Sequence, residues 1–358
     1  MRFALAGGGT GGHAYPAIAV AERLREDHHA DLVYYGTPHG PERAAAEQAG
    51  IPFRAVPARQ IRGRSPWRLA TGLASLWRGT ETAARWLAED RPQAVFATGG
   101  YAAAPVGRAA RRLGVPLIVF LPDVHPGWAV RFLARYASTV ACSVDASLAA
   151  LPAGRGVVTG YPVRRQFLEA TREEGVARFG LDPALRTVLV AGGSLGAQQI
   201  NRAVAAGLPG LLERAQLVHI SGAEDEAWLQ GERARLPAAL RARYHLHAYT
   251  QEMAYAMRAA DLAVTRAGAS TLGELPVTGL PAILVPGGFS DQHRNAAHLA
   301  DQGAALVLPS TRLEELHGLI VALIDDDQRR TGMAEAMRRH ARPDAAGRLA
   351  ALMMEAAA

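Results

Sequence analysis

The stretch that decides the fold of this chain is Gly7-Gly8-Gly9-Thr10-Gly11-Gly12-His13-Ala14-Tyr15-Pro16. An apolar run at residues 3–6 precedes it and predicts a buried strand, and the apolar spacing of residues 17–24 predicts a helix after it. Glycines let a ligand approach the backbone, and Pro16 suits the first turn of a helix. The turn therefore predicts a site for an anion or a partly negative oxygen at a helix start, with His13 inside it.

The same turn also matches the G-x-G-x-x-G pattern of dinucleotide-binding enzymes, through Gly7, Gly9 and Gly12. Nicotinamide enzymes usually place an acid at the end of the second strand, where it binds a ribose. Here the second apolar run, residues 32–36, is followed by no acid before Glu42. The missing acid argues against a nicotinamide dinucleotide, and we expect no cofactor.

Bulk composition indicates a folded chain of two domains. The chain has 358 residues, of which 49% are hydrophobic and 20% charged, as in globular proteins with large cores. The lone Cys142 excludes an internal disulfide and suits a reducing compartment. The first apolar run is too short for a secretory signal, and prolines interrupt the uncharged stretch at residues 275–290, so no transmembrane helix is predicted.

The net charge of +6 comes entirely from arginine, because the chain contains no lysine. A basic balance is compatible with phosphorylated substrates or acidic lipid surfaces. Nucleic acid is not expected, because no basic stripe alternates with aromatic residues and no zinc-ligand spacing occurs. No metal site is predicted either, since the sequence has no H-E-x-x-H or C-x-x-C motif.

Apolar runs alternate with helical segments along the whole chain. Strands are predicted at residues 3–6, 32–35, 94–97, 117–120, 139–142, 187–191, 217–220, 244–247, 262–264 and 282–285. Continuous apolar strands between helices predict parallel sheets covered on both faces. A second glycine-rich turn follows residues 187–191, so the pattern restarts there. The prediction is an α/β fold of two Rossmann-like parallel-sheet domains facing a central cleft, residues 1–160 with a returning C-terminal helix at 342–358, and residues 161–341.

A long helix is predicted near residues 66–89. Its core face would carry Leu69, Leu73, Leu76, Trp77, Thr80, Ala84 and Leu87. The opposite face would carry Trp67, Arg78 and Arg85, with Arg68 and Trp86 nearby. Tryptophan and arginine on an outer helix face suit a membrane interface, and the alternative is that the tryptophans pack against neighbouring loops.

Two segments of the second half carry polar groups suited to a nucleotide sugar. Residues 265–274 follow a strand and open a helix, with hydroxyls for phosphate oxygens and Glu274 one turn in, where it could bind vicinal sugar hydroxyls. Residues 285–295 combine a glycine turn with amides and a histidine. The alternatives are an ordinary first-turn acid and a solvated loop.

Together these motifs resemble those of the two-domain GT-B glycosyltransferases, and within them the bacterial peptidoglycan enzymes that form lipid II. The resemblance covers almost the whole chain. The matching motifs are residues 8–13 with Pro16, residues 99–101, Gly160 with residues 162–164, residues 192–197, residues 266–269 with Thr271 and Glu274, and Gln292 with Asn295.

The resemblance implies UDP-N-acetylglucosamine as donor and a lipid-linked muramoyl-pentapeptide as acceptor, at the cytoplasmic face of the membrane. Implied donor-binding residues are Thr10, Gly11, Gly12, Asp123, Arg164, Ser194, Thr250, Ala269, Ser270, Thr271, Leu272, Gly273, Glu274 and Gln292. Gly99, Gly100 and Tyr101 would line the acceptor side, and Trp67, Arg68, Arg78 and Arg85 would face an anionic membrane. His13 is the candidate catalytic base, because histidine exchanges protons near neutral pH.

Two departures from the family pattern concern the acceptor side. The family usually has His-Glu-Gln-Asn after the fifth strand, where this chain has Phe120-Leu121-Pro122-Asp123, and Tyr161 stands where asparagine is usual. His125 lies close by in the sequence and could supply an imidazole. The alternatives are therefore a related transferase with another acceptor, a UDP-N-acetylglucosamine 2-epimerase, and a catalytically silent UDP-sugar-binding protein.

Overall fold

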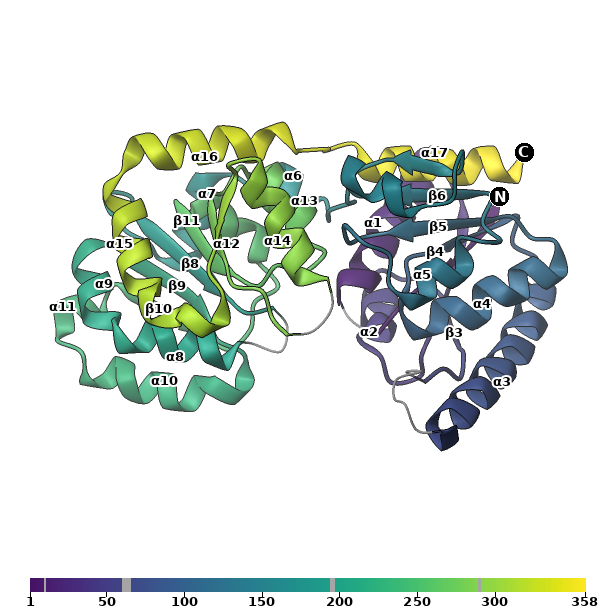
Figure 1. Cartoon of the computed structure of the whole chain (residues 1–358), viewed down its shortest axis with the longest axis horizontal. Coiled ribbons are helices and arrows are strands. Elements are labelled where there is room, and N and C mark those ends of the chain that lie inside the picture. The colour runs from purple at the N-terminus through teal and green to yellow at the C-terminus, as the bar shows by residue number, and fades with distance from the viewer. Residues whose placement is uncertain (10, 60–65, 194–196, 289–290) are drawn as a thin grey trace. The chain divides into compact units, whose positions relative to one another are not determined.

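The computed structural model describes residues 1–9, 11–59, 66–193, 197–288 and 291–358, without the side chains of residues 66–70, and the chain divides into two compact units (Figure 1). Residues 1–164 and 342–358 form the first unit, and residues 165–341 form the second. Each unit is built on a parallel β-sheet, so the predicted class of two Rossmann-like domains is confirmed. Residues 161–164, which we assigned to the second domain, belong to the first unit.

The first unit holds a sheet of seven strands within the described residues, in the order β3-β2-β1-β4-β5-β6-β7. The strands are β1 (Arg2–Ala6), β2 (Asp31–Gly36), β3 (Phe53–Ala55), β4 (Ala94–Ala97), β5 (Leu117–Leu121), β6 (Thr139–Cys142) and β7 (Gly156–Val158). The strand order reverses between β1 and β4, which are hydrogen-bonded neighbours. In open α/β sheets, ligands bind outside the carboxyl ends of the strands at such a reversal.

Helices cover both faces of this sheet. They are α1 (Gly11–His28), α2 (Pro41–Gln48), α3 (Pro66–Asp90), α4 (Gly100–Leu113), α5 (Trp128–Leu133), the 3-10 helix η1 (Asp145–Ala150) and α17 (Ala345–Ala357). One core layer joins α3, α4 and α5 to alternate strand residues such as Val95 and Val119. On the sheet's other side α17 contacts β4, β5 and α1, so the C-terminal helix completes the first unit (Figure 1).

The second unit repeats this construction with a sheet ordered β10-β9-β8-β11-β12-β13. Its strands are β8 (Thr187–Ala191), β9 (Gln216–Ile220), β10 (Tyr244–His247), β11 (Leu262–Thr265), β12 (Ala282–Leu284) and β13 (Ala305–Val307). Its helices are α6 (Gln166–Glu169), α7 (Arg172–Phe179), α8 (Gln198–Ala206), α9 (Leu208–Arg214), α10 (Ala223–Arg235), α11 (Ala238–Arg241), α12 (Met253–Ala259), α13 (Thr271–Thr278), α14 (Gln292–Asp301), η2 (Ser310–Glu315), α15 (Leu316–Asp325) and α16 (Asp327–Arg339). The order reverses between β8 and β11, in the same way as between β1 and β4.

Three strands were not predicted, namely β3, β7 and β13. Each has three residues and lies at a sheet edge. Their side chains are partly exposed, so they do not form the continuous apolar runs that mark the inner strands.

The predicted core face of α3 was partly wrong. Leu76 and Leu87 are buried as expected, but Leu73 and Trp77 are 55% and 59% exposed. Trp86, expected near the outer face, packs against the core, and the Arg54 guanidinium lies 4.4 Å from the centroid of its ring. The main packing partner of α3 is α4. Only the side of α3 that faces this helix is buried, so some of the apolar side chains of α3 remain exposed. The side chains of Trp67, Arg68 and Leu69 lie outside the described part of the structure.

The buried His219 predicts a pH dependence of stability in the second unit. Its Nδ1 lies 2.9 Å from the Tyr244 hydroxyl and its Nε2 lies 2.9 Å from the Asn201 side-chain oxygen, so one nitrogen accepts and the other donates. Burial lowers the pKa of His219 from 6.5 to about 4, so the imidazole is neutral in the folded protein at neutral pH. Between pH 6.5 and about 4, the unfolded chain therefore binds one more proton at His219 than the folded protein does. The contribution of neutral His219 to stability is complete above pH 6.5, and it is lost as the pH falls from 6.5 toward about 4.

We expect the free energy of unfolding to fall by up to about 1.4 kcal/mol per pH unit from this group on acidification. Urea unfolding of the wild type and of His219→Gln at several pH values measures the difference, because glutamine stays neutral. An equal pH dependence in the two proteins would contradict the assignment.

Candidate active site

His13 lies at the carboxyl end of β1, in the first turns of α1, and contacts the segment that follows β4. Its Nδ1 is 2.8 Å from the Thr98 carbonyl oxygen, which can only accept, so Nδ1 carries the proton and Nε2 carries the lone pair. The buried Thr98 hydroxyl donates in return to the His13 carbonyl oxygen at 2.6 Å. The protein thus fixes the half-buried imidazole in the tautomer whose Nε2 can accept a proton.

The glycine-rich turn and the segment after β4 fit together without room for side chains. Gly100 has a φ of 77°, and a Cβ atom there would lie 1.8 Å from the Gly8 carbonyl oxygen. Gly9 has a φ of 91°, and its Cβ would lie 3.1 Å from the ring of Tyr101. The structure therefore brings Gly99, Gly100 and Tyr101 together with the glycine-rich turn. Thr10 lies outside the described residues.

Pro16 does not lie in the first turn of its helix, contrary to the prediction. Helix α1 begins at Gly11, so Pro16 is inside the helix and offers no N–H to the Gly12 carbonyl one turn earlier. The hydroxyl of buried Tyr161 donates to that carbonyl oxygen at 3.2 Å. This tyrosine, at a position where the family usually has asparagine, therefore satisfies a carbonyl that the proline leaves without its helical donor.

The end of β5 and the segment after it differ in chemistry from the family pattern. Phe120 and Leu121, at the positions where histidine and glutamate are usual, are 0% and 1% exposed and belong to the core. The Phe120 ring packs against Tyr161, with 6.0 Å between ring centroids. His125 accepts a hydrogen bond from Arg131 at 2.8 Å between Nε2 and the guanidinium nitrogen. Asp123 lies at the same edge of the sheet, where its carbonyl oxygen accepts from the Ser147 hydroxyl.

Arg164, expected near a diphosphate, lies in the first unit. Its guanidinium carbon is 4.5 Å from the ring centroid of Tyr15, on the same helix as His13. Arg164 is therefore beside the α1 segment of the candidate site.

In the second unit, the predicted donor-binding residues gather at the carboxyl ends of β11 and β12. The Thr271 hydroxyl donates to the Gly268 carbonyl oxygen at 2.5 Å, which closes the turn containing Ala269 and Ser270. Glu274 lies one turn into α13 and is half-buried, and Leu272 and Gly273 are buried beside it. Ser194 lies outside the described residues.

The loop between β12 and α14 is tied to this turn. The buried Asn295 donates from Nδ2 to the Ala267 carbonyl oxygen at 3.1 Å, and the Gln292 side-chain oxygen accepts from the Gly287 N–H at 2.7 Å. Arg266 donates to the Val285 carbonyl oxygen, and burial lowers its pKa. The two loops therefore present amide, carboxylate and guanidinium groups on one edge of the sheet.

Thr250 follows β10 at the same edge, and its hydroxyl oxygen accepts from the Glu252 N–H at 2.9 Å at the start of α12. Among the described residues, no cluster of three or more His, Cys, Asp or Glu side chains is arranged to hold a metal ion.

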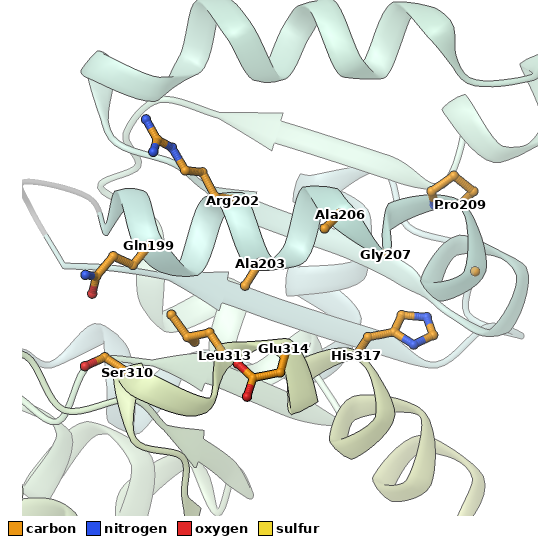
Figure 2. Close-up of a pocket in the computed structure, with 11 residues that line it drawn as sticks. Gln199, Arg202, Ala203, Ala206, Gly207, Pro209, Ser310, Leu313, Glu314 and His317 are labelled. Carbon is orange, nitrogen blue, oxygen red and sulfur yellow. The ribbon is translucent and has the colours of Figure 1, made fainter.

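A separate hollow of about 740 Å³ lies elsewhere on the second unit. Figure 2 shows Gln199, Arg202 and Ala203 of α8 on one side, and Ser310, Leu313 and Glu314 of η2 on the other. His317 closes one end, where its ring leaves no room for a side chain at Gly207. Among the residues that the structure describes, none of the predicted donor-binding residues lines this hollow, so we do not include it in the candidate site.

Three residues with a clear role in the site geometry were not predicted to have one. Thr98 and Glu42 contact the glycine-rich turn, and Arg266, directly after β11, donates to the Val285 carbonyl oxygen in the loop that precedes Gln292. Thr98 binds His13 through its backbone carbonyl, a group that every residue has, so the sequence could not indicate this contact. The signal that could have indicated Glu42 is the group of glycines around it, at positions 8, 36 and 40.

Comparison with known proteins gives full-length matches. Residues 3–142 match the glycosyltransferase family 28 N-terminal domain, and residues 187–349 match the glycosyltransferase family 28 C-terminal domain. A protein of Roseiflexus sp. (strain RS-1), named UDP-N-acetylglucosamine--N-acetylmuramyl-(pentapeptide) pyrophosphoryl-undecaprenol N-acetylglucosamine transferase, is 41% identical over 99% of this chain and 94% of its own length. The protein of the same name from Bacillus subtilis (strain 168) is 33% identical over 99% of both chains. The crystal structure of MurG from Acinetobacter baumannii matches with a TM-score of 0.78 and 29% identity over 99% of both chains.

Replacing Tyr161 by phenylalanine tests how the Gly12 carbonyl is satisfied. Because Pro16 supplies no N–H, Tyr161→Phe removes a donor from a carbonyl inside the helix, and we expect a loss of about 1–3 kcal/mol in the free energy of unfolding. Urea unfolding measures this. The double variant Tyr161→Phe/Pro16→Ala should regain part of the loss, since alanine provides the N–H. Unchanged stability in Tyr161→Phe would refute the role.

Proposed function

The chain belongs to glycosyltransferase family 28, and on that premise we propose that it transfers N-acetylglucosamine from UDP-N-acetylglucosamine to undecaprenyl-diphospho-muramoylpentapeptide. The reaction is an inverting hexosyl transfer to the muramoyl 4-hydroxyl, and its product is lipid II of peptidoglycan synthesis. The structural observation that supports it best is the imidazole of His13, fixed by Thr98 with Nε2 as acceptor at the carboxyl end of β1.

Inverting transfer needs a base at the attacking hydroxyl. The acceptor oxygen attacks C1 of the sugar, the bond from C1 to the UDP oxygen breaks, and UDP departs with the electron pair. We propose that Nε2 of His13 takes the proton of the acceptor hydroxyl. The Thr98 carbonyl, 2.8 Å from Nδ1, then stabilises the imidazolium that forms. Tyr101, whose ring packs over Gly9, would border the acceptor together with Gly99 and Gly100.

The second unit supplies groups suited to the donor. The N-terminal turn of α13, with Ala269 to Gly273, would bind phosphate oxygens through N–H groups and hydroxyls, and Glu274 would accept from the ribose hydroxyls. Gln292, held by Gly287, would bind the sugar, and Thr250 would lie beside the uracil. Ser194 and Arg164 would stabilise the departing diphosphate without a metal ion. Thr10, Gly11, Gly12 and Asp123 would contact the sugar from the first unit.

A lipid-linked acceptor requires contact with a membrane surface, and α3 carries suitable side chains. Leu73 and Trp77 lie one turn apart and are more than half exposed, next to exposed Arg78. Arg85 is exposed further along the same helix. We propose that this side of α3 binds the anionic cytoplasmic face of the membrane. In the described part of the chain, no helix has the length and apolar character needed to cross a bilayer.

The purified protein should convert radiolabelled UDP-N-acetylglucosamine and short-chain lipid I into a β-linked disaccharide product, with release of UDP. Formation of UDP-N-acetylmannosamine without acceptor would indicate an epimerase instead. Binding of UDP with no product on any lipid acceptor would indicate a silent sugar-nucleotide-binding protein.

In the same assay, His13→Ala should lower kcat by about 10²–10⁴-fold, because the acceptor hydroxyl loses its base. The KM for UDP-N-acetylglucosamine should change little. His125→Ala is the matched control for a second imidazole, and it should retain turnover. Unimpaired kcat in His13→Ala would remove His13 as the base.

Binding of the protein to vesicles containing anionic lipid tests the membrane proposal. We expect Leu73→Ser/Trp77→Ser to lower the vesicle-bound fraction by about tenfold or more, because two large apolar groups are lost from the surface. Tyr249→Ser is the control, since Tyr249 is 57% exposed in the second unit. Equal binding of wild type and double variant in a flotation assay would place the membrane contact elsewhere.

A further inference from the structure

Glu42 is a fully buried acid that the transfer steps above do not use. It lies in the first turn of α2 and its exposed fraction is 0%. One carboxylate oxygen, Oε2, accepts from the Gly9 N–H at 3.0 Å. The other, Oε1, accepts from the Thr37 N–H at 2.8 Å and from the Thr37 hydroxyl at 2.6 Å. The carboxylate therefore joins the loop after β2 to the glycine-rich turn after β1.

The space around this carboxylate is formed by glycine backbone. A Cβ atom at Gly8 would lie 2.1 Å from Oε1, and one at Gly40 would lie 2.1 Å from Oε2. At Gly36 a Cβ would lie 2.6 Å from the Glu42 side-chain carbon Cγ. Any larger residue at these positions would displace the carboxylate, so the three glycines and Glu42 form one close-packed unit.

Tyr34 supports the same turn from the neighbouring strand. Its hydroxyl donates to the Gly7 carbonyl oxygen at 3.2 Å. Burial, and secondarily the charge of Glu42, raise the pKa of Tyr34, so the hydroxyl stays protonated and remains a donor. Thus Tyr34 holds the carbonyl side of the turn at Gly7, and Glu42 holds its N–H side at Gly9.

We propose that Glu42 is a positioning residue for the transfer reaction, which holds the glycine-rich turn in the conformation that presents His13. This inference rests on the proposed function. Gly9 has a φ of 91°, a conformation that glycine adopts readily but also leaves readily. The hydrogen bond to Oε2 restricts that freedom two residues before α1 begins. The direction of α1 at its start determines where the His13 imidazole lies.

The geometry also distinguishes Glu42 from an acid that binds a ribose. A ribose-binding acid after the second strand presents its carboxylate to the ligand. Both Glu42 oxygens instead accept donors from the protein, inside a space with no exposed area. The role of Glu42 is therefore to organise the turn, and the ligand is not its partner.

Glu42→Gln keeps the size of the side chain but replaces one acceptor oxygen with a donor. Either Gly9 or Thr37 then faces an N–H₂ group and loses its hydrogen bond. We expect kcat to fall by about tenfold or more at saturating substrates, because small displacements of a catalytic group have large effects on rate. The KM for UDP-N-acetylglucosamine should stay within about twofold, since the groups proposed to bind UDP lie mainly in the second unit.

Thr37→Val is the matched control. It removes the hydroxyl bond to Oε1 but leaves the bond between Gly9 and Oε2 in place. We expect its kcat to stay within about twofold of the wild type. Hydrogen exchange followed by mass spectrometry gives a readout that does not depend on activity, because the peptide containing Gly9 should exchange faster in Glu42→Gln than in Thr37→Val.

Wild-type kcat together with wild-type exchange in Glu42→Gln would overturn the proposal. An equal loss of kcat in both variants, at equal loss of stability, would also overturn it in favour of a purely structural role. If Glu42→Gln does not fold, Glu42→Asp retains the charge but shortens the reach to Gly9, and full activity in that variant would refute the inference. If the wild type forms no lipid-linked product, the proposed function fails, and hydrogen exchange still decides the role of Glu42.

Discussion

The hydrogen bond between His13 Nδ1 and the Thr98 carbonyl is the interaction on which the candidate site depends. It exists because β1 and β4 are hydrogen-bonded neighbours in the sheet, with Ala6 beside Ala97 at their carboxyl ends, although the two strands are far apart in the sequence. Reversal of the strand order at this point leaves the carboxyl ends of both strands uncovered by a crossover. The tautomer of the His13 imidazole is therefore fixed by a backbone carbonyl that belongs to another βα unit.

Close backbone packing is the second condition for this arrangement. Gly8 and Gly100 approach so closely that a side chain at Gly100 would overlap a carbonyl oxygen. Such a turn has little apolar surface to stabilise it, and glycine gains the most freedom on unfolding. Buried polar side chains provide the stabilisation instead, with Glu42 at Gly9 and Tyr161 at Gly12. Each of them satisfies a backbone group inside the turn.

Two residues that depart from the family pattern, Phe120 and Tyr161, contact each other and support the same turn. Phe120 is in the core, its ring contacts Tyr161, and the Tyr161 hydroxyl reaches the carbonyl that Pro16 leaves without a helical donor. The apolar packing of Phe120 at the end of β5 and the Tyr161 hydroxyl after β7 thus support the same turn. In the second unit the equivalent support comes from amides, because Asn295 and Gln292 hold neighbouring loops through backbone groups.

The sequence by itself determined the class of the fold and most inner strands. Buried parallel strands require continuous apolar runs, and the tight turns between such strands and their helices require glycine. It also predicted site roles for His13, Glu274 and Gln292 from their positions after strands. Edge strands such as β3, the exposure of Trp77 and the internal position of Pro16 were decided only by the tertiary structure, because burial depends on what packs against a segment. The same holds for the contacts of Thr98 and Glu42, in which one of the two groups belongs to the backbone: the Thr98 carbonyl binds the His13 side chain, and the Gly9 N–H donates to the Glu42 carboxylate. Every residue has such a carbonyl and nearly every residue such an N–H, so the sequence does not show which of them will be used.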